Sequence, residues 1–126
     1  MAVVAAGPTA GKLNLTIQQG ATFSVQLTYK AGADPVSATA VNLTGYTARL
    51  KIRPTWSSDT VHVSLTESDG IALGGSAGTI TLSRTPAQTA AYTWRDGVYD
   101  LELETPLGVV RRVVEGKVLI VPEVTR

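Results

Sequence analysis

The stretch from Thr85 to Glu104 constrains the fold of this chain more than any other, because it begins as a helix and ends as a strand. Thr85 and Gln88 have the spacing of a capping box, and Pro86 stands at the first helical position, where a missing N–H costs nothing. Further on, apolar and acidic side chains alternate with the period of a half-buried strand: Tyr99, Asp100, Leu101, Glu102, Leu103 and Glu104. One helical turn at about residues 86–92 followed by such a strand predicts a crossing between the two sheets of a β-sandwich.

The same period of two recurs along the chain in short segments that are separated by turn signals. We count eight or nine such strands, which is typical of an all-β sandwich. The first two, at residues 13–18 and 22–29, predict a hairpin or a close sequential pair around Gln19 and Gly20. A glycine inside a strand pattern often marks a β-bulge, so Glu115 and Gly116 predict one near the end of the chain.

Gly97, Tyr99 and Leu101 resemble the tyrosine corner of immunoglobulin-like domains. In that motif a tyrosine near the start of a strand bonds back to the preceding turn, and a core residue follows two positions later. The match is partial, because Asp96 is one residue closer to the tyrosine than in the antibody pattern. The sequence therefore predicts an immunoglobulin-like β-sandwich of 7–9 antiparallel strands, with one short helical turn and an extended N-terminal arm.

The first eleven residues show no periodicity and contain two glycines and a proline. We interpret residues 1–11 as an arm and residues 12–126 as the β-sandwich domain. The arm would be held either by a neighbouring chain or by its own domain. Side chains that we expect to contact other subunits lie in the arm, in a polar loop and in the tail after Pro122: Val3, Val4, Pro8, Trp56 and Val124.

The composition favours protein partners. Charged residues make up 17% of the chain, below the roughly 25% of an average globular domain, so much of the surface must be neutral. Such a surface suits packing against other proteins, although a quiet threonine-rich surface is an equal interpretation. A formal net charge of +1 argues against nucleic acid as the main partner. Cysteine is absent, which excludes disulfides and thiolate metal sites. No apolar run predicts a signal peptide or a membrane span.

The sequence shows no arrangement that predicts catalysis, so we expect no enzyme, no cofactor, no metal and no small-molecule substrate. His62 is the one histidine, and we interpret it as an outward residue on a strand. The acidic side chains after Asp96 would lie on one strand face, spread over roughly 13 Å, which suits cross-strand pairing better than a calcium cage. Their partners would be the basic residues of a neighbouring strand or those across the hairpin: Arg49, Lys51 and Arg53, or Arg111 and Arg112. A nucleic-acid patch built from the first three with Trp56 is the weaker interpretation.

Three segments, residues 15–23, 42–53 and 97–103, resemble small virion proteins of tailed bacteriophages and prophages, as does the closing segment 115–118. The resemblance covers roughly residues 13–125, and residues 43–53 are its most specific part. It extends to the N-terminal domains of baseplate adaptors that attach receptor-binding proteins to the tail. The resemblance implies an immunoglobulin-like β-sandwich without catalytic residues, which serves as a structural or adaptor component of the particle.

We therefore expect a virion protein of the tail, baseplate or neck, made in the cytoplasm of the bacterial host. It would dock other virion proteins, with several copies of itself in a symmetric ring. Because no receptor-binding extension follows the sandwich, we expect docking rather than direct host recognition. A head decoration protein is the first alternative. A carbohydrate- or receptor-binding module is the second, and it would need a shallow aromatic platform near Trp56 and Trp94.

Overall fold

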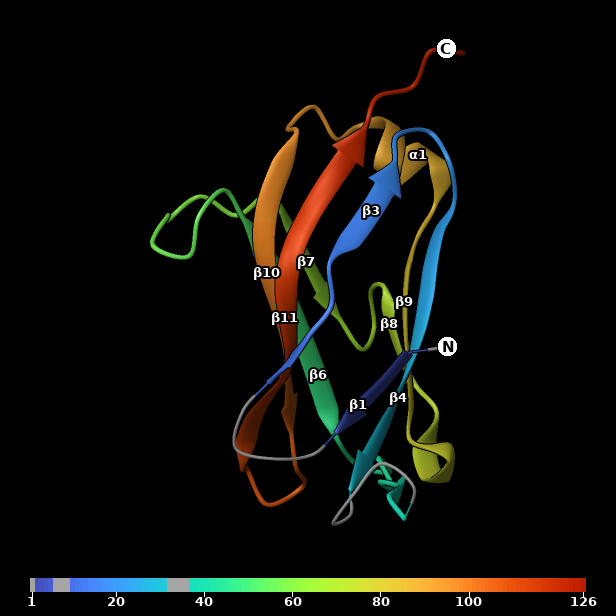
Figure 1. The fold of residues 1–126 in the computed structure, drawn as a ribbon, viewed down its shortest axis with the longest axis vertical. Coiled ribbons are helices and arrows are strands. Elements are labelled where there is room, and N and C mark those ends of the chain that lie inside the picture. The colour runs from blue at the N-terminus through green and yellow to red at the C-terminus, as the bar shows by residue number, and fades with distance from the viewer. Residues whose placement is uncertain (1, 6–9, 32–36) are drawn as a thin grey trace.

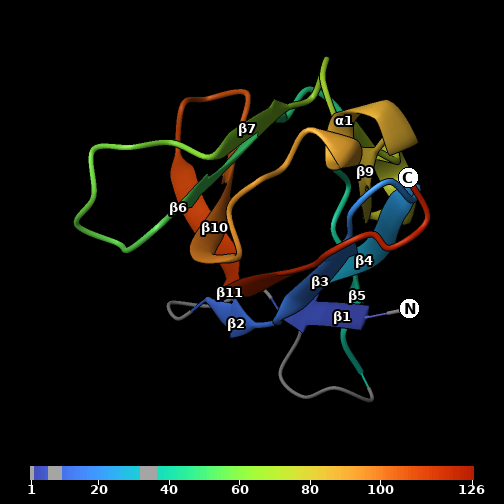
Figure 2. The same cartoon turned by 90° about the horizontal axis from the view of Figure 1, so that it is seen from above.

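The computed structural model describes residues 2–5, 10–31 and 37–126, with residues 2–5 described by their backbone alone. The described residues form two β-sheets that pack face to face (Figure 1), which confirms the predicted all-β sandwich. One five-residue helix, α1 (Pro86–Ala90), and one short 3-10 turn, η1 (Gly75–Ala77), interrupt the strands. Figure 2 looks along the strands and shows the two layers with α1 at one end of the gap between them.

The first sheet has five strands in the order β1-β4-β9-β8, with β5 paired to β4. Its strands are β1 (Ala2–Ala5), β4 (Phe23–Ala31), β5 (Thr39–Ala40), β8 (Ile71–Leu73) and β9 (Thr79–Arg84). The second sheet has six strands in the order β2-β11-β10-β6-β7, with β3 paired to β11. Its strands are β2 (Gly11–Lys12), β3 (Leu15–Gln18), β6 (Thr47–Arg53), β7 (Val63–Thr66), β10 (Asp96–Glu104) and β11 (Val110–Val121).

The order β4-β9-β8 in one sheet and β11-β10-β6 in the other corresponds to strands B-E-D and G-F-C of the immunoglobulin arrangement. The sequence had predicted antiparallel strands throughout, and this part of the prediction is wrong. β1 runs parallel to β4, and both β2 and β3 run parallel to β11. A parallel partner at a sheet edge leaves the alternation of buried and exposed side chains unchanged. The period of two in the sequence therefore does not indicate whether a strand pairs in parallel or antiparallel.

The predicted hairpin between the first two clear strands is wrong, because β3 and β4 lie in different sheets. The chain crosses between the sheets at Gln19 and Gly20 instead. The backbone N–H of Gln19 donates to the carbonyl of Val121, and its side-chain amide donates to the carbonyl of Tyr92 at 3.0 Å. The two alternating segments therefore face one core from opposite sides.

The predicted crossing from Thr85 to Glu104 is confirmed. The hydroxyl of Thr85 accepts the N–H of Gln88, and the Gln88 side chain accepts the N–H of Thr85, which completes the capping box with Pro86 at the start of the helix. β9 before the helix belongs to the five-stranded sheet and β10 after it to the six-stranded sheet. The helix is anchored by Thr89, which is fully buried and donates to the carbonyl of Ala21.

The core between the sheets consists of aliphatic side chains with two tyrosines. Its members are Leu15, Ile17, Leu27, Tyr29, Leu43, Ala48, Leu50, Ile52, Val63, Leu65, Ile71, Ile80, Leu82, Tyr99, Leu101, Leu103, Val113, Val114, Val118 and Ile120. Leu101, which the tyrosine-corner pattern placed in the core, is completely buried. Gly97 is required at the start of β10, because an added Cβ would lie 2.7 Å from the carbonyl oxygen of Arg53.

The bulge lies earlier in β11 than the sequence had predicted. Leu101 pairs with Val114 and Glu102 pairs with Arg112, so Val113 is the extra residue, and both valines point into the core. Gly116 has a different role. A Cβ there would lie 2.1 Å from the carbonyl oxygen of Leu13, so the glycine lets the segment between β2 and β3 cross close to β11.

Candidate functional site

The outer face of the six-stranded sheet carries a row of carboxylates along its central strand, β10. Asp100, Glu102 and Glu104 alternate there with buried residues. On the β6 side, Arg49 binds two of them, with Nε 2.9 Å from Glu102 and a terminal nitrogen 3.2 Å from Glu104. These contacts confirm the predicted cross-strand pairing. We call this set, with the residues in the next paragraph, the charged face.

On the β11 side, Arg112 lies 3.4 Å from Asp100 and 3.6 Å from Glu115, and Glu115 also binds Lys12 of β2. The hydrogen bond from Lys12 lowers the pKa of Glu115, with a smaller contribution from Arg112. Burial raises the pKa of Asp100, and Arg112 opposes that effect. Exposed pairs of this kind add little stability, but their order across the four strands β2, β11, β10 and β6 sets the register. Among the described residues, no three histidine, aspartate or glutamate side chains gather closely enough to hold a metal ion.

Arg111 and Arg112 were both predicted as partners of the acidic row, and only Arg112 takes that role. Arg111 pairs across the ladder with the buried Leu103, whereas Arg112 pairs with the outward Glu102. Neighbouring residues on a strand point to opposite faces, so the two arginines cannot share one face. Arg111 points to the inner side of the sheet, at the end of the sandwich.

Trp56 stands in the loop between β6 and β7, which projects from the side of the six-stranded sheet (Figure 1). Its side chain is 88% exposed. It borders a shallow depression of about 830 Å³ over the charged face, together with Lys51 and Arg53 of β6. The loop is tied back to the sheet where Arg53 donates to the carbonyl of Ser58 at 3.1 Å. Trp56 is therefore a bulky aromatic side chain in solvent at the border of a charged surface.

Trp94 has a different environment from Trp56. It is half-buried, packs against the core and stacks on His62, with ring centroids 4.5 Å apart and planes 1° from parallel. His62 is thus half-buried beside an aromatic ring, and the prediction of an outward strand residue is wrong. It lies just before β7, where its N–H donates to the carbonyl of Ile52, and this bend turns the ring inward. In the described part of the chain, no ring contact joins Trp94 to Trp56.

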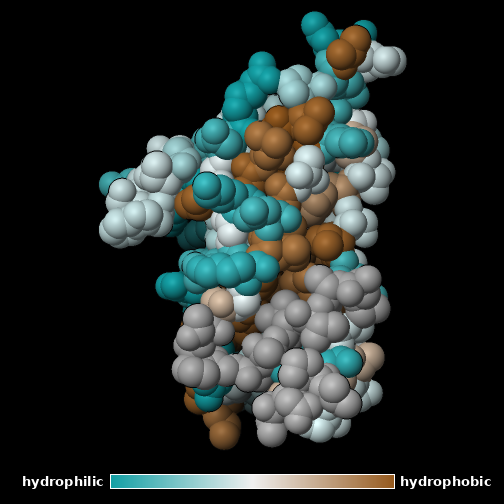
Figure 3. Space-filling model, in the orientation of Figure 1, coloured by the Kyte–Doolittle hydropathy of each residue, from teal (hydrophilic) through white to brown (hydrophobic). Residues whose placement is uncertain are grey.

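Two groups of apolar side chains are exposed. The first, the hairpin tip, lies between β10 and β11 and consists of Leu107, Val109 and Val110. The second, the apolar strip, lies at the opposite end of β11 and consists of Leu119, Val121 and Val124. Leu107 is 94% exposed and Val124 is 89% exposed. Figure 3 shows apolar surface over the upper parts of β3 and β11, beside the polar side chains of the charged face.

The N-terminal segment lies against its own domain in this structure. Val3 and Val4 belong to β1 and pair with Thr28 and Tyr29 of β4. This geometry corresponds to the second of the two interpretations of the arm, in which the segment folds back onto its own chain. Pro8 lies outside the described residues.

The sequence was compared with known protein families and with curated proteins. The sequence matches no protein-family model and no curated protein. No helix among the described residues is long and apolar enough to cross a membrane. The features that sequence reasoning missed are the inward direction of Arg111, the half-buried position of His62 and the exposure of Leu107. The first two depend on a bulge and a bend, and neither has a distinct sequence signal.

Proposed function

We propose that this chain is a non-enzymatic structural protein of a tailed-bacteriophage particle, located in the tail, baseplate or neck, where it docks other virion proteins. The observation that carries the proposal is the near-complete exposure of three bulky apolar side chains, Trp56, Leu107 and Val124. Large apolar groups in solvent mark interaction surfaces when they gather at defined places, and aromatic residues are enriched at such contacts. The resemblance of residues 13–125 to small virion proteins supports the same role.

The arrangement of the exposed side chains suits a protein that contacts neighbours on more than one side. The hairpin tip and the apolar strip lie at opposite ends of β11, and Trp56 lies on the loop beside β6. A subunit of a closed ring needs two different contact surfaces, one for each neighbour. Between them, the charged face offers ordered polar groups that suit specificity more than affinity.

The test is the presence and copy number of the chain in purified particles, measured by quantitative mass spectrometry. A tail, baseplate or neck protein is expected at about a dozen copies or fewer, set by the symmetry of the tail. Hundreds of copies would support the head decoration alternative. Absence from particles, in a host that produces the chain, would contradict both.

A further inference from the structure

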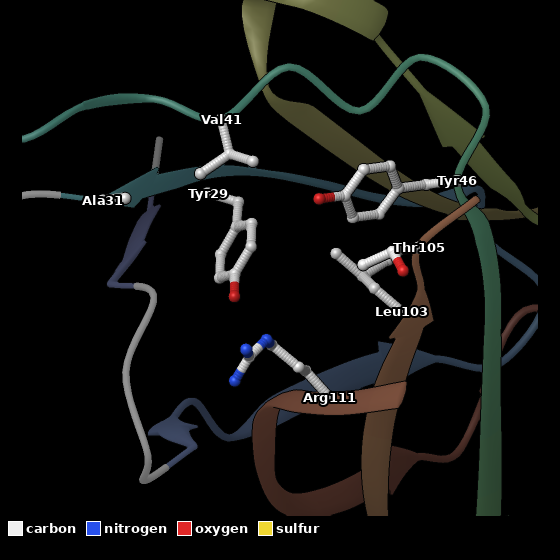
Figure 4. A pocket seen from close by; sticks show the side chains of 7 residues that line it. All are labelled: Tyr29, Ala31, Val41, Tyr46, Leu103, Thr105 and Arg111. Atoms are coloured by element: carbon white, nitrogen blue, oxygen red, sulfur yellow. The ribbon is translucent and has the colours of Figure 1, made fainter. Parts of the chain in front are cut away.

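A pocket of about 360 Å³ opens at the end of the sandwich that carries the β10–β11 hairpin. It lies between the two sheets, so strands from both contribute to its wall (Figure 4). Its lining residues are Tyr29, Ala31, Val41, Tyr46, Leu103, Thr105 and Arg111. This volume lies at the small end of the range of ligand pockets in proteins, which suits a group of one or two residues in size.

Arg111 brings a cation to a position where the strand pattern would place an apolar side chain. Its ladder partner is Leu103, which faces the core, and paired residues on neighbouring strands share a face. In the part of the chain that the structure describes, no carboxylate lies within ion-pair distance of Arg111. Its neighbour Arg112, on the opposite face, lies within 3.6 Å of two carboxylates. The guanidinium therefore has five N–H donors and no charged partner among the described residues.

Two tyrosines complete the polar wall. Figure 4 shows the hydroxyl of Tyr29 directed toward the guanidinium of Arg111, and the hydroxyl of Tyr46 directed into the same space. Burial raises the pKa of Tyr29, and the charge of Arg111 opposes that shift, so the guanidinium acts on this hydroxyl. The raised pKa keeps the Tyr29 phenol protonated at neutral pH, so its hydroxyl can donate a hydrogen bond. Val41 and Leu103 supply the apolar part of the wall.

We propose that this pocket binds a carboxylate attached to a small apolar group, such as the C-terminal residue or an acidic side chain of a peptide. The planar guanidinium of Arg111 fits two carboxylate oxygens, and the tyrosine hydroxyls can donate to the same oxygens. The apolar part of the ligand would pack on Val41 and Leu103. This site is separate from the charged face and does not depend on a virion role.

The experiment is a titration followed by NMR, with 3-phenylpropionate as the probe and 3-phenylpropanamide as its uncharged counterpart. We expect the acid to bind in the range of about 0.1–1 mM and to shift the ring signals of Tyr29 and Tyr46, and the amide to bind at least about tenfold more weakly. Arg111→Gln should weaken binding of the acid by about tenfold or more. The matched control is Arg112→Gln, which removes the neighbouring charge on the opposite face and should leave the affinity unchanged.

Two further arms identify the source of the carboxylate and the role of the chain's own residues. A tetrapeptide with a free C-terminus is compared with the amidated peptide, and with an amidated peptide that carries a glutamate side chain. Tyr46→Phe should weaken binding without loss of folding, which keeps the proposal testable if Arg111→Gln unfolds. Equal binding of acid and amide, equal effects of the two arginine variants, or no binding of any probe would overturn the proposal.

Discussion

The phenolic hydroxyl of Tyr99 donates a hydrogen bond of 2.6 Å to the backbone carbonyl of Leu13, 86 residues earlier in the chain. The tyrosine lies on β10 and the leucine in the crossing between β2 and β3, with Gly116 of β11 between them. In the tyrosine corner the bond returns to the turn just before the strand. Here it fixes the first edge of the six-stranded sheet to its centre.

Tyr99→Phe should lower the free energy of unfolding by about 1–2 kcal/mol, because the carbonyl of Leu13 loses a buried donor. Urea denaturation of the isolated chain measures the change. Tyr46→Phe serves as the control, since no hydrogen bond of its hydroxyl occurs in the described structure, and its effect should stay within about 0.5 kcal/mol. Equal losses in the two variants would contradict a role for the bond to Leu13.

Stability should fall above pH 10 because of the buried tyrosines. Burial raises the pKa of Tyr99 far above its ordinary value of 10.0, and Tyr29 and Tyr92 shift in the same direction. The unfolded chain loses these protons near pH 10 while the folded chain keeps them. The stabilisation is therefore complete below pH 10 and is lost as the pH rises toward the folded-state pKa, by up to about 1.4 kcal/mol per pH unit for each proton.

Urea denaturation between about pH 9 and pH 11 measures this slope. Tyr99→Phe removes one of the titrating groups, so its free energy of unfolding should fall less steeply over the same interval than that of the unmodified chain. Contributions that the two proteins share cancel in the comparison. Parallel slopes would show that Tyr99 does not contribute.

Gly116→Ala should destabilise the chain by about 2–4 kcal/mol, because its Cβ would lie 2.1 Å from the carbonyl oxygen of Leu13 and the crossing segment must move. Gly108→Ala is the comparison. That glycine has φ of +88° but no atom within 4 Å of an added Cβ, so only backbone strain of about 1 kcal/mol is expected. Thermal or urea unfolding separates the two costs, and a smaller effect at Gly116 would contradict the close approach.

Thr85→Ala should cost about 1 kcal/mol of stability through loss of the capping box. The helix α1 has five residues, so its first turn depends on this cap more than a longer helix would. Hydrogen exchange should show faster exchange at Gln88 and Thr89, with little change in the β10–β11 hairpin. Thr85→Ser keeps the acceptor oxygen and is expected to retain most of the protection.

Trp56→Ser, Leu107→Ser and Val124→Ser should each leave the unfolding free energy within about 0.5 kcal/mol of the unmodified chain, because these side chains are 88%, 94% and 89% exposed. Incorporation into particles should fall for at least one of them, measured by quantitative mass spectrometry of the purified particles. Ser57→Ala, an exposed neighbour of Trp56, is the control. Normal incorporation of all three variants would contradict the proposed contacts.

Most of the fold could be predicted from the sequence, because alternation, turns and caps are local. The capping box of Thr85 and Gln88 depends on residues three apart, and the structure confirms it. The sheet to which each strand belongs is not local. β3 and β4 have the same alternation as a hairpin, but β3 pairs with β11 and β4 pairs with β9, so the two strands lie in different sheets.

The candidate surfaces could be predicted only where they follow from the local alternation of side chains. The pairing of Arg49 with Glu102 follows from charge alternation on two strands, and the structure confirms it. The orientation of His62 depends on a bend before β7, and that of Arg111 depends on a bulge. The bulge changes the phase of β11 by one residue, and the bend places His62 outside β7. The alternation of the flanking residues reveals neither of these irregularities.

The extra residue, Val113, determines which of two adjacent arginines, Arg111 or Arg112, points to the inner side of the sheet. Counted back from the buried Ile120 with strict alternation, Arg112 would point inward and Arg111 would point to solvent. The bulge reverses that choice, so β11 presents the ion-paired Arg112 to the outer surface. Arg111, which has no charged partner among the described residues, lines the pocket instead. Deletion of Val113 would therefore exchange the two arginines between the faces, and an insertion or loss of one residue could convert a ligand pocket into part of an ion-pair ladder within a single evolutionary step.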